Sequence, residues 1–235
     1  MSPDPSLLGD ADPYDLMDRE AARLDAFFAS LPAEAWSRPS ACSDWDVRAM
    51  LGHLAASEAY NHACLDDGLP TFLEGLGARG VTDMDSFNAV GVADMAGLSS
   101  QDALDEWRRA NGETRRRMRE RRGGELPTMA GPYPMDWQAW HLANELAIHA
   151  DDIGVPVAAD EAAERAAWLT AFARFAVTET DKGVVVAPVD RGYRAASGET
   201  EAVLSAEDLV AAVNSRPLAS GAELPADLAS SLAMM

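Results

Sequence analysis

The sequence predicts a mainly α protein in which a helical domain comes first and a small α+β domain follows. Apolar residues recur at helical spacing along most of the chain, and the period changes to that of strands only near its end. The 235 residues, 48% of them hydrophobic, suffice for a sizeable core, and no internal repeat is found. We therefore expect a helical domain at residues 10–178 and a small α+β domain at residues 179–235.

Local signals set the ends of the expected helices. Pro32 stops the first helix, and Asp46 is a plausible N-cap for the second. Ser99 and Asp102 form a capping-box pattern ahead of the third, and Gly154 ends the fourth. The expected helices are residues 13–31, 47–65, 101–122, 137–154 and 160–179, with a short helix at 85–94.

The last part of the chain reads as a pair of strands followed by a short helix. GVVVAPV and RGYRAAS are the two strands, and Ser197 to Thr200 is a turn. Ser205 then opens the helical segment DLVAAVNSR.

Charge and hydropathy exclude several classes of partner. The formal net charge of -20 repels nucleic-acid phosphates and anionic lipid surfaces. The basic run Arg115–Arg122 is the local exception, and we interpret it as a solvated helix face. Neither a membrane-spanning run nor an N-terminal basic-then-apolar signal is present. These features predict a cytoplasmic protein without a nucleic-acid or membrane partner.

The two cysteines, Cys42 and Cys64, are too few for a disulfide framework. A reducing compartment would keep both as thiols. Cys42 could serve as a nucleophile or a metal ligand, although a small buried thiol is the commoner role of such a residue.

The stretch WQAWHLANELAIHADDIG, residues 137–154, carries the strongest candidate site. His141, Glu145 and His149 are each four residues apart, so they stand above one another on one helix stripe. Glu145 and His149 can therefore reach one cation together. A solvated stripe or a set of hydrogen-bonded core groups would show the same spacing, and this pattern is less specific than His-Glu-x-x-His.

A third ligand is expected from the second helix. His53 lies near its apolar face, between Met50 and Leu54, where a histidine is either a metal ligand or a hydrogen-bonded core residue. His62, nine residues further on, lies on the opposite side of that helix and cannot share the same centre.

Several segments resemble the maleylpyruvate isomerase N-terminal family, the mycothiol-dependent relatives of the DinB-like helical bundles. The segment CSDWDVRAMLGHLAASE resembles that family's C-x-x-W-x-V-x-x-x-x-x-H-L pattern. The stretch around Glu145 and His149 resembles its second segment, DSFNAV its D-x-x-N element, and DLVAAVNSRP its C-terminal D-L-x-x-x-x-x-x-R. Together these segments cover most of the chain, although its C-terminal part is shorter than the family pattern.

The resemblance implies a DinB-like four-helix bundle that binds a divalent metal, usually zinc, through His53, Glu145 and His149. Asp152, three residues after His149, is expected to orient a ligand imidazole through its second ring nitrogen. His141 has no ligand counterpart in the family and is expected to line the pocket.

The resemblance also implies a mycothiol-dependent S-transferase or cis-trans isomerase, which would add a thiolate held at the metal to an electrophilic small molecule. Trp45, His141 and Asn144 are candidates for a polar pocket around the cofactor, and Arg216 for a contact with substrate carboxylate or thiol. Two alternatives stay open: a metal-dependent hydrolase or isomerase that uses water, and a non-catalytic metal- or ligand-binding protein. A monomer or a weak homodimer is expected.

Overall fold

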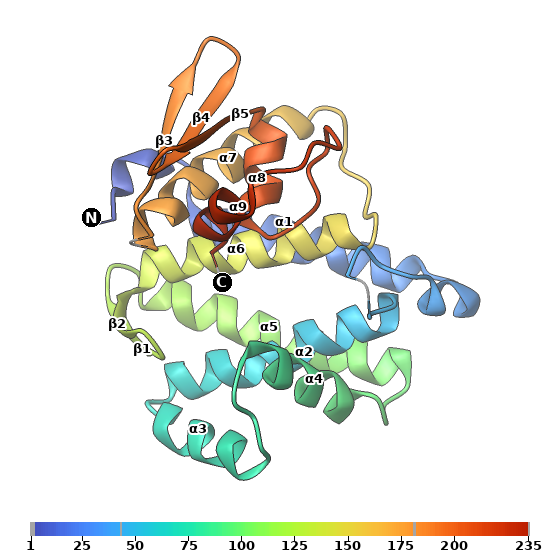
Figure 1. Cartoon of the computed structure of the whole chain (residues 1–235). Helices are drawn as coiled ribbons and strands as arrows, with labels where there is room; N and C mark the ends of the chain where they lie inside the picture. The colour runs from blue at the N-terminus through green and yellow to red at the C-terminus, as the bar shows by residue number, and fades with distance from the viewer. Residues whose placement is uncertain (1–2, 43, 181, 235) are drawn as a thin grey trace. The chain divides into compact units, whose positions relative to one another are not determined.

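The computed structural model describes residues 3–42, 44–180 and 182–234, and they form a mainly helical chain with two small antiparallel sheets (Figure 1). The helical segments are η1 (Pro5–Leu8), α1 (Pro13–Ser30), η2 (Ala33–Ser37), α2 (Val47–Leu65), α3 (Leu69–Ala78), α4 (Met84–Met95), α5 (Ser100–Glu120), α6 (Met135–Asp152), α7 (Ala162–Glu179), α8 (Ala206–Val213) and α9 (Ala226–Leu232). The strands are β1 (Glu125–Thr128), β2 (Gly131–Pro134), β3 (Val184–Val189), β4 (Gly192–Ser197) and β5 (Thr200–Leu204). The predicted class, a helical bundle with a C-terminal α+β part, is confirmed.

The chain divides into two compact units. Asp12–Pro156 forms one unit, and the other combines the described residues up to Ala11 with those from Val157 onward. The expected boundary between residues 178 and 179 therefore differs from the observed one, because α7 packs with η1 and α8. Its apolar face, predicted from the sequence, is buried by elements of that second unit.

The unit Asp12–Pro156 is built on α1, α2, α5 and α6. Helix α1 packs with α6 and α5, and α2 packs with α5, so apolar side chains from all four meet in one core. Truncating one large core side chain to alanine typically costs about 2–5 kcal/mol. The largest of its fully buried members are Phe28, Met50, Leu51, Leu24, Leu104 and Trp107.

The predicted helix caps are present. The Asp46 carboxylate accepts a hydrogen bond from the Ala49 amide at 2.7 Å, and the Ser99 hydroxyl accepts one from the Asp102 amide at 3.1 Å. After α6, Gly154 adopts φ +72, a left-handed conformation that glycine takes without strain. The caps at Asp46 and Gly154 lie at the start of α2 and after the end of α6, the two helices that carry the candidate ligands.

Two parts of this unit were not predicted. The connection after α2 contains helix α3 as well as the expected short helix α4, which runs from Met84 to Met95. The segment before α6, where no strand was expected, is the hairpin β1–β2, in which Pro127 pairs with Pro132. Proline lacks the amide proton that a strand ladder uses, so a proline in the sequence argues against a strand. The prolines of this hairpin therefore point away from the structure that forms.

The second unit contains a three-stranded antiparallel sheet in the order β3-β4-β5. The predicted strands and the turn between Ser197 and Thr200 are present, but β5 was not predicted. The predicted helix after Ser205 is α8, whose N-cap is that serine, and the short helix α9 was also missed.

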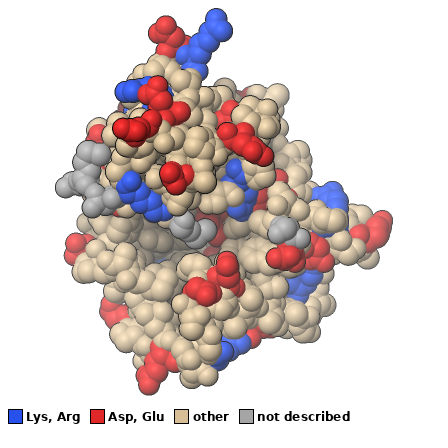
Figure 2. Space-filling model, in the orientation of Figure 1, with Lys and Arg blue, Asp and Glu red and all other residues tan. Residues whose placement is uncertain are grey.

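Acidic and basic side chains are interspersed on the face seen in Figure 2. Arginines of the basic run pair with acids in α1 and at its N-cap: Arg119 lies 2.8 Å from Asp15 and 2.7 Å from Asp18, and Arg122 lies 2.6 Å from Asp12. Exposed pairs of this kind contribute about 0–1 kcal/mol each, but here they neutralise the run locally.

Among the described residues, no helix has both the length and the apolar character that crossing a membrane requires.

Candidate metal centre

Helices α2 and α6 bring His53, Glu145 and His149 together. His53 Nε2 lies 3.0 Å from Glu145 Oε1, and His149 Nε2 lies 3.1 Å from the same oxygen. One potential ligand atom from each of the three residues lies within 4.8 Å of the others. The two imidazoles thus converge on one carboxylate oxygen, from two helices that are far apart in sequence.

The cluster is buried on its histidine side and open on its carboxylate side. The side chains of His53 and His149 are 8% and 9% exposed, whereas that of Glu145 is 40% exposed. The step of four residues along α6 places Glu145 directly before His149 on one stripe, as the spacing predicts. A small molecule could therefore approach the cluster past the carboxylate.

The pKa values of Glu145 and His149 are both displaced from their ordinary values. Burial by itself would raise the pKa of Glu145, but the charges and hydrogen bonds of His149 and His53 hold that pKa well below its ordinary value. Burial would lower the pKa of His149, yet Glu145, Asp152 and Cys42 together raise it well above its ordinary value. Without a metal, the cluster is thus a carboxylate bound to a protonated imidazole.

Asp152 fixes the orientation of His149, as predicted. Its Oδ2 lies 2.9 Å from His149 Nδ1, and its side chain is 4% exposed. A proton on Nδ1 donates to this carboxylate and leaves Nε2 directed at Glu145. This tautomer suits metal binding through Nε2, because ligand histidines usually donate their other ring N–H to such a partner.

Cys42 lies on the other side of Asp152. Its Sγ donates to Asp152 Oδ2 at 3.3 Å, and Cys42, His149 and Asp152 form a second group whose ligand atoms lie within 4.8 Å of one another. The sequence analysis favoured an inert buried thiol here, and the Cys42-x-x-Trp45 spacing was the signal that could have placed Cys42 beside the site. The two groups share His149.

Of the three residues expected to line a cofactor pocket, Trp45 is the one in ring contact with the histidine cluster. Its ring centroid lies 4.8 Å from that of His53 and 6.4 Å from that of His149. Asn144 is buried beside Glu145 on α6. His141 lies one turn earlier, with Nε2 3.1 Å from the Tyr133 hydroxyl, a partner from β2 that the sequence did not indicate.

Arg216 and His62 each have a backbone carbonyl as a partner. Arg216 belongs to the second compact unit, where its guanidinium donates to the Asn214 carbonyl at 3.0 Å just after α8. His62 is on α2 but turns toward α5, and its Nε2 lies 3.2 Å from the Ala110 carbonyl. The exclusion of His62 from the site agrees with this geometry.

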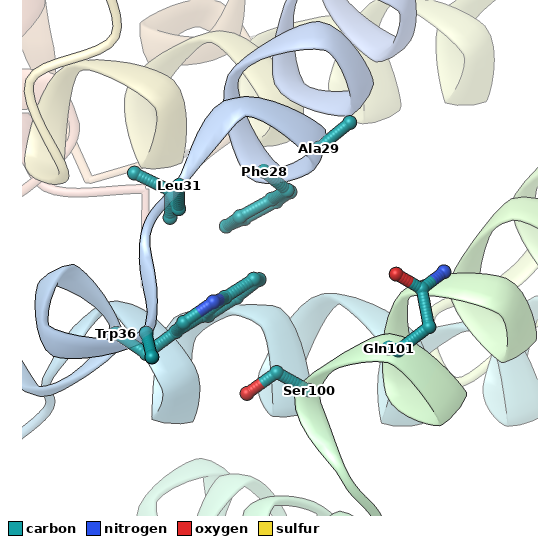
Figure 3. A pocket seen from close by; sticks show the side chains of 7 residues that line it. Phe28, Ala29, Leu31, Trp36, Ser100 and Gln101 are labelled. Atoms are coloured by element: carbon teal, nitrogen blue, oxygen red, sulfur yellow. The ribbon is translucent and has the colours of Figure 1, made fainter.

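A separate pocket of about 360 Å³ opens at the end of the bundle core (Figure 3). Phe28 of α1 and Trp36 of η2 stack there with ring centroids 5.7 Å apart, and Ser100 and Gln101 of α5 face them. Its lining contains no histidine, cysteine or carboxylate, so it offers no ligand set comparable with the first cluster.

The first cluster has the donor chemistry of a catalytic metal site. Two imidazole nitrogens and one carboxylate oxygen are ligands that Zn²⁺ takes, and three protein ligands leave a coordination position open. The partly exposed Glu145 places that opening toward solvent. The residues therefore fit a divalent metal with an accessible position.

The comparisons with known proteins agree with this architecture. A crystal structure of mycothiol-dependent maleylpyruvate isomerase has a similar fold, with a TM-score of 0.53 and 14% identity over 70% of this chain and 68% of that one. A histidine-to-alanine mutant of such an isomerase gives a TM-score of 0.53 and 15% identity, over 73% of this chain and 71% of that one.

No curated protein sequence matches the chain significantly. The family model described as the mycothiol maleylpyruvate isomerase N-terminal domain matches residues 17–154, which include α2, α6 and all three converging side chains. The chain therefore belongs to the mycothiol maleylpyruvate isomerase N-terminal domain family.

Proposed function

We propose that this protein is a metal- and mycothiol-dependent enzyme, an S-transferase or cis-trans isomerase acting on an electrophilic small molecule. His53, Glu145 and His149 hold the metal, most suitably zinc. The observation that carries the proposal is the convergence of both Nε2 atoms on Glu145 Oε1, at 3.0 and 3.1 Å. Membership of the family supports the thiol as the partner.

The charge of the ligand set supports a thiolate rather than a neutral ligand. Two neutral imidazoles and one carboxylate leave one net positive charge on a dication. A bound metal of this charge would lower the pKa of a coordinated thiol and hold it as a nucleophilic thiolate at neutral pH.

The chain's own residues would hold and surround the reactants. Asp152 keeps His149 Nε2 directed at the metal position by accepting from Nδ1 at 2.9 Å. The Trp45 ring lies against the imidazole of His53, with the two ring centroids 4.8 Å apart. We assign Trp45, His141 and Asn144 to binding of the cofactor's polar groups, and Arg216 to an anionic group of the substrate or cofactor.

A cobalt titration tests the proposal in two steps. Cobalt-loaded protein should develop a thiolate-to-metal charge-transfer band when mycothiol is added, and turnover of an electrophilic substrate should require both metal and thiol. Glu145→Ala should abolish the band, and His62→Ala should keep it. Spectra indifferent to mycothiol, with metal-dependent turnover in water alone, would replace the thiol proposal by a hydrolase.

We also propose that the working form is a monomer or weak homodimer in the cytoplasm. The formal net charge of -20 opposes nonspecific association. Light scattering at micromolar concentration should give the mass of one chain, or of two in slow exchange with one. A stable higher oligomer would contradict this.

A further inference from the structure

The loop between η2 and α2 is fastened to the end of α6. Arg38 Nη2 donates to the Ile153 carbonyl at 2.8 Å, and the Ala41 amide donates to the Asp152 carbonyl at 2.8 Å. The loop is also closed on itself, since the Ser40 amide donates to the Trp45 carbonyl at 3.0 Å. Two backbone acceptors, the carbonyls of Asp152 and Ile153, thus hold the loop to the end of α6, beside the candidate ligand His149.

The same loop places the Cys42 thiol beside the Asp152 carboxylate, which orients His149. Cys42 Sγ donates to Asp152 Oδ2 at 3.3 Å, and this oxygen is the one that faces His149 Nδ1 at 2.9 Å. The Asp152 side chain is only 4% exposed, so water has little access to it. One carboxylate oxygen therefore serves both the imidazole and the thiol.

We propose that Cys42 is a positioning residue for the metal centre, acting through Asp152 on His149. This inference rests on the proposed function for its metal, but the hydrogen-bond chain exists within the protein alone. A carboxylate held by two donors has one preferred rotation, and that rotation fixes the His149 ring plane and the direction of Nε2. Without the thiol, the carboxylate loses one of the donors that set this rotation, and the ring direction becomes less well defined.

Zinc affinity tests the proposal with a matched set of variants. Loss of a group that orients a ligand typically weakens metal binding about 10–100-fold, which is the effect expected for Asp152→Ala. Cys42 acts one step further away, so Cys42→Ala should raise the zinc Kd about threefold to tenfold. Cys42→Ser, which keeps a donor, should restore the Kd to within about twofold of the original protein. Competition with a chromogenic chelator measures these values.

A double-mutant cycle separates positioning from a general structural effect. In the Asp152→Ala background, Cys42→Ala should have no further effect on the zinc Kd, because the chain is already broken. The control is Cys64→Ala, which removes the fully buried thiol of α2 and should leave the Kd unchanged. An equal loss in both backgrounds, or no loss with Cys42→Ala alone, would overturn the proposal.

A metal-free measurement keeps this test independent of the proposed function. Ring-nitrogen NMR of the metal-free protein should show a hydrogen-bonded Nδ1–H on His149. That resonance should shift in Cys42→Ala, return in Cys42→Ser and stay in place in Cys64→Ala. A protein that binds no metal would refute the proposed function. The position of this resonance would still test the role of Cys42, because it is measured without metal. An unmoved resonance in Cys42→Ala would refute that role.

Discussion

Helix α2 carries two buried polar clusters that differ in how their charge is satisfied. In the first, the Glu58 carboxylate accepts hydrogen bonds from Thr114 at 2.5 Å, Asn111 at 2.8 Å and Asn61 at 3.1 Å. All its donors are neutral and both oxygens are used. This cluster is complete without any ligand and joins α2 to α5.

The second cluster, around His53, is arranged in the opposite way. Two imidazoles converge on a single oxygen of Glu145, and the carboxylate is partly exposed. A shared proton satisfies these groups only while no cation is present, and all three can instead bind one metal. The difference teaches how a carboxylate with a structural role, saturated by neutral donors, can be told from a candidate ligand, whose partners can themselves bind a metal and which stays partly exposed.

The largest expected effect comes from breaking the second cluster. His53→Ala, Glu145→Ala and His149→Ala should each lower zinc content from about one per chain to below roughly 0.1, because two remaining ligands bind weakly. Elemental analysis after gel filtration measures this. Full occupancy in any variant would remove that residue from the ligand set.

A pair of isosteric substitutions sharpens the comparison. Glu58→Gln replaces one acceptor oxygen by an amide that faces donors already in place, so it should destabilise folding by about 1–3 kcal/mol. Zinc content should stay unchanged. Glu145→Gln should have the reverse pattern, with weakened zinc binding and an unfolding free energy of the metal-free protein within about 1 kcal/mol of the original.

Denaturant titrations of the metal-free proteins, with zinc analysis of the same samples, compare the two substitutions directly. Equal loss of stability in both variants would mean that the two clusters do not differ as described.

Zinc binding should depend on pH. Because the pKa of His149 is raised well above its ordinary value, its imidazole is protonated at pH 7 without metal, and zinc must displace that proton. Affinity should therefore rise with pH, by about tenfold per unit near neutrality. Calorimetry in buffers of different ionisation enthalpy counts the proton released. The expected count is about one proton released per metal bound. An affinity that does not change between about pH 6 and 8 would contradict this protonation state.

The smallest effect is expected at His62, which lies on the same helix as His53 but contacts the Ala110 carbonyl of α5. His62→Ala should leave zinc content unchanged and cost about 1 kcal/mol or less, since it removes one partly exposed hydrogen bond. Zinc loss in this variant would show that α2 as a whole, rather than His53, controls the site.

Much of the fold is predicted by local sequence signals at the ends of helices. The cap residues Asp46 and Ser99 and the glycine Gly154 mark helix ends because each serves its own backbone neighbours. The hairpin β1–β2 and the third strand β5 were missed, because strand pairing depends on partners. Proline at positions such as Pro127 and Pro132 favours a loop when the pairing is not visible.

The sequence also predicted some residues of the candidate site better than others. Glu145 and His149 share one helix, so spacing alone puts them on one stripe. Periodicity places His53 near the apolar face of its own helix and makes it a candidate, and the resemblance implies the same three residues; that His53 meets the other two depends on how the helices of the bundle pack. Cys42 was not expected beside Asp152, since its place depends on the hydrogen bonds that fasten the loop to α6.

Zinc K-edge X-ray absorption tests the central claim most directly, because it reports the atoms bound to the metal. The zinc-loaded protein alone should show only nitrogen and oxygen neighbours, from His53, Glu145 and His149. Mycothiol should add one sulfur at about 2.3 Å. A sulfur neighbour before any thiol is added would place the metal at Cys42 instead, and no sulfur after mycothiol would contradict the thiol-binding centre.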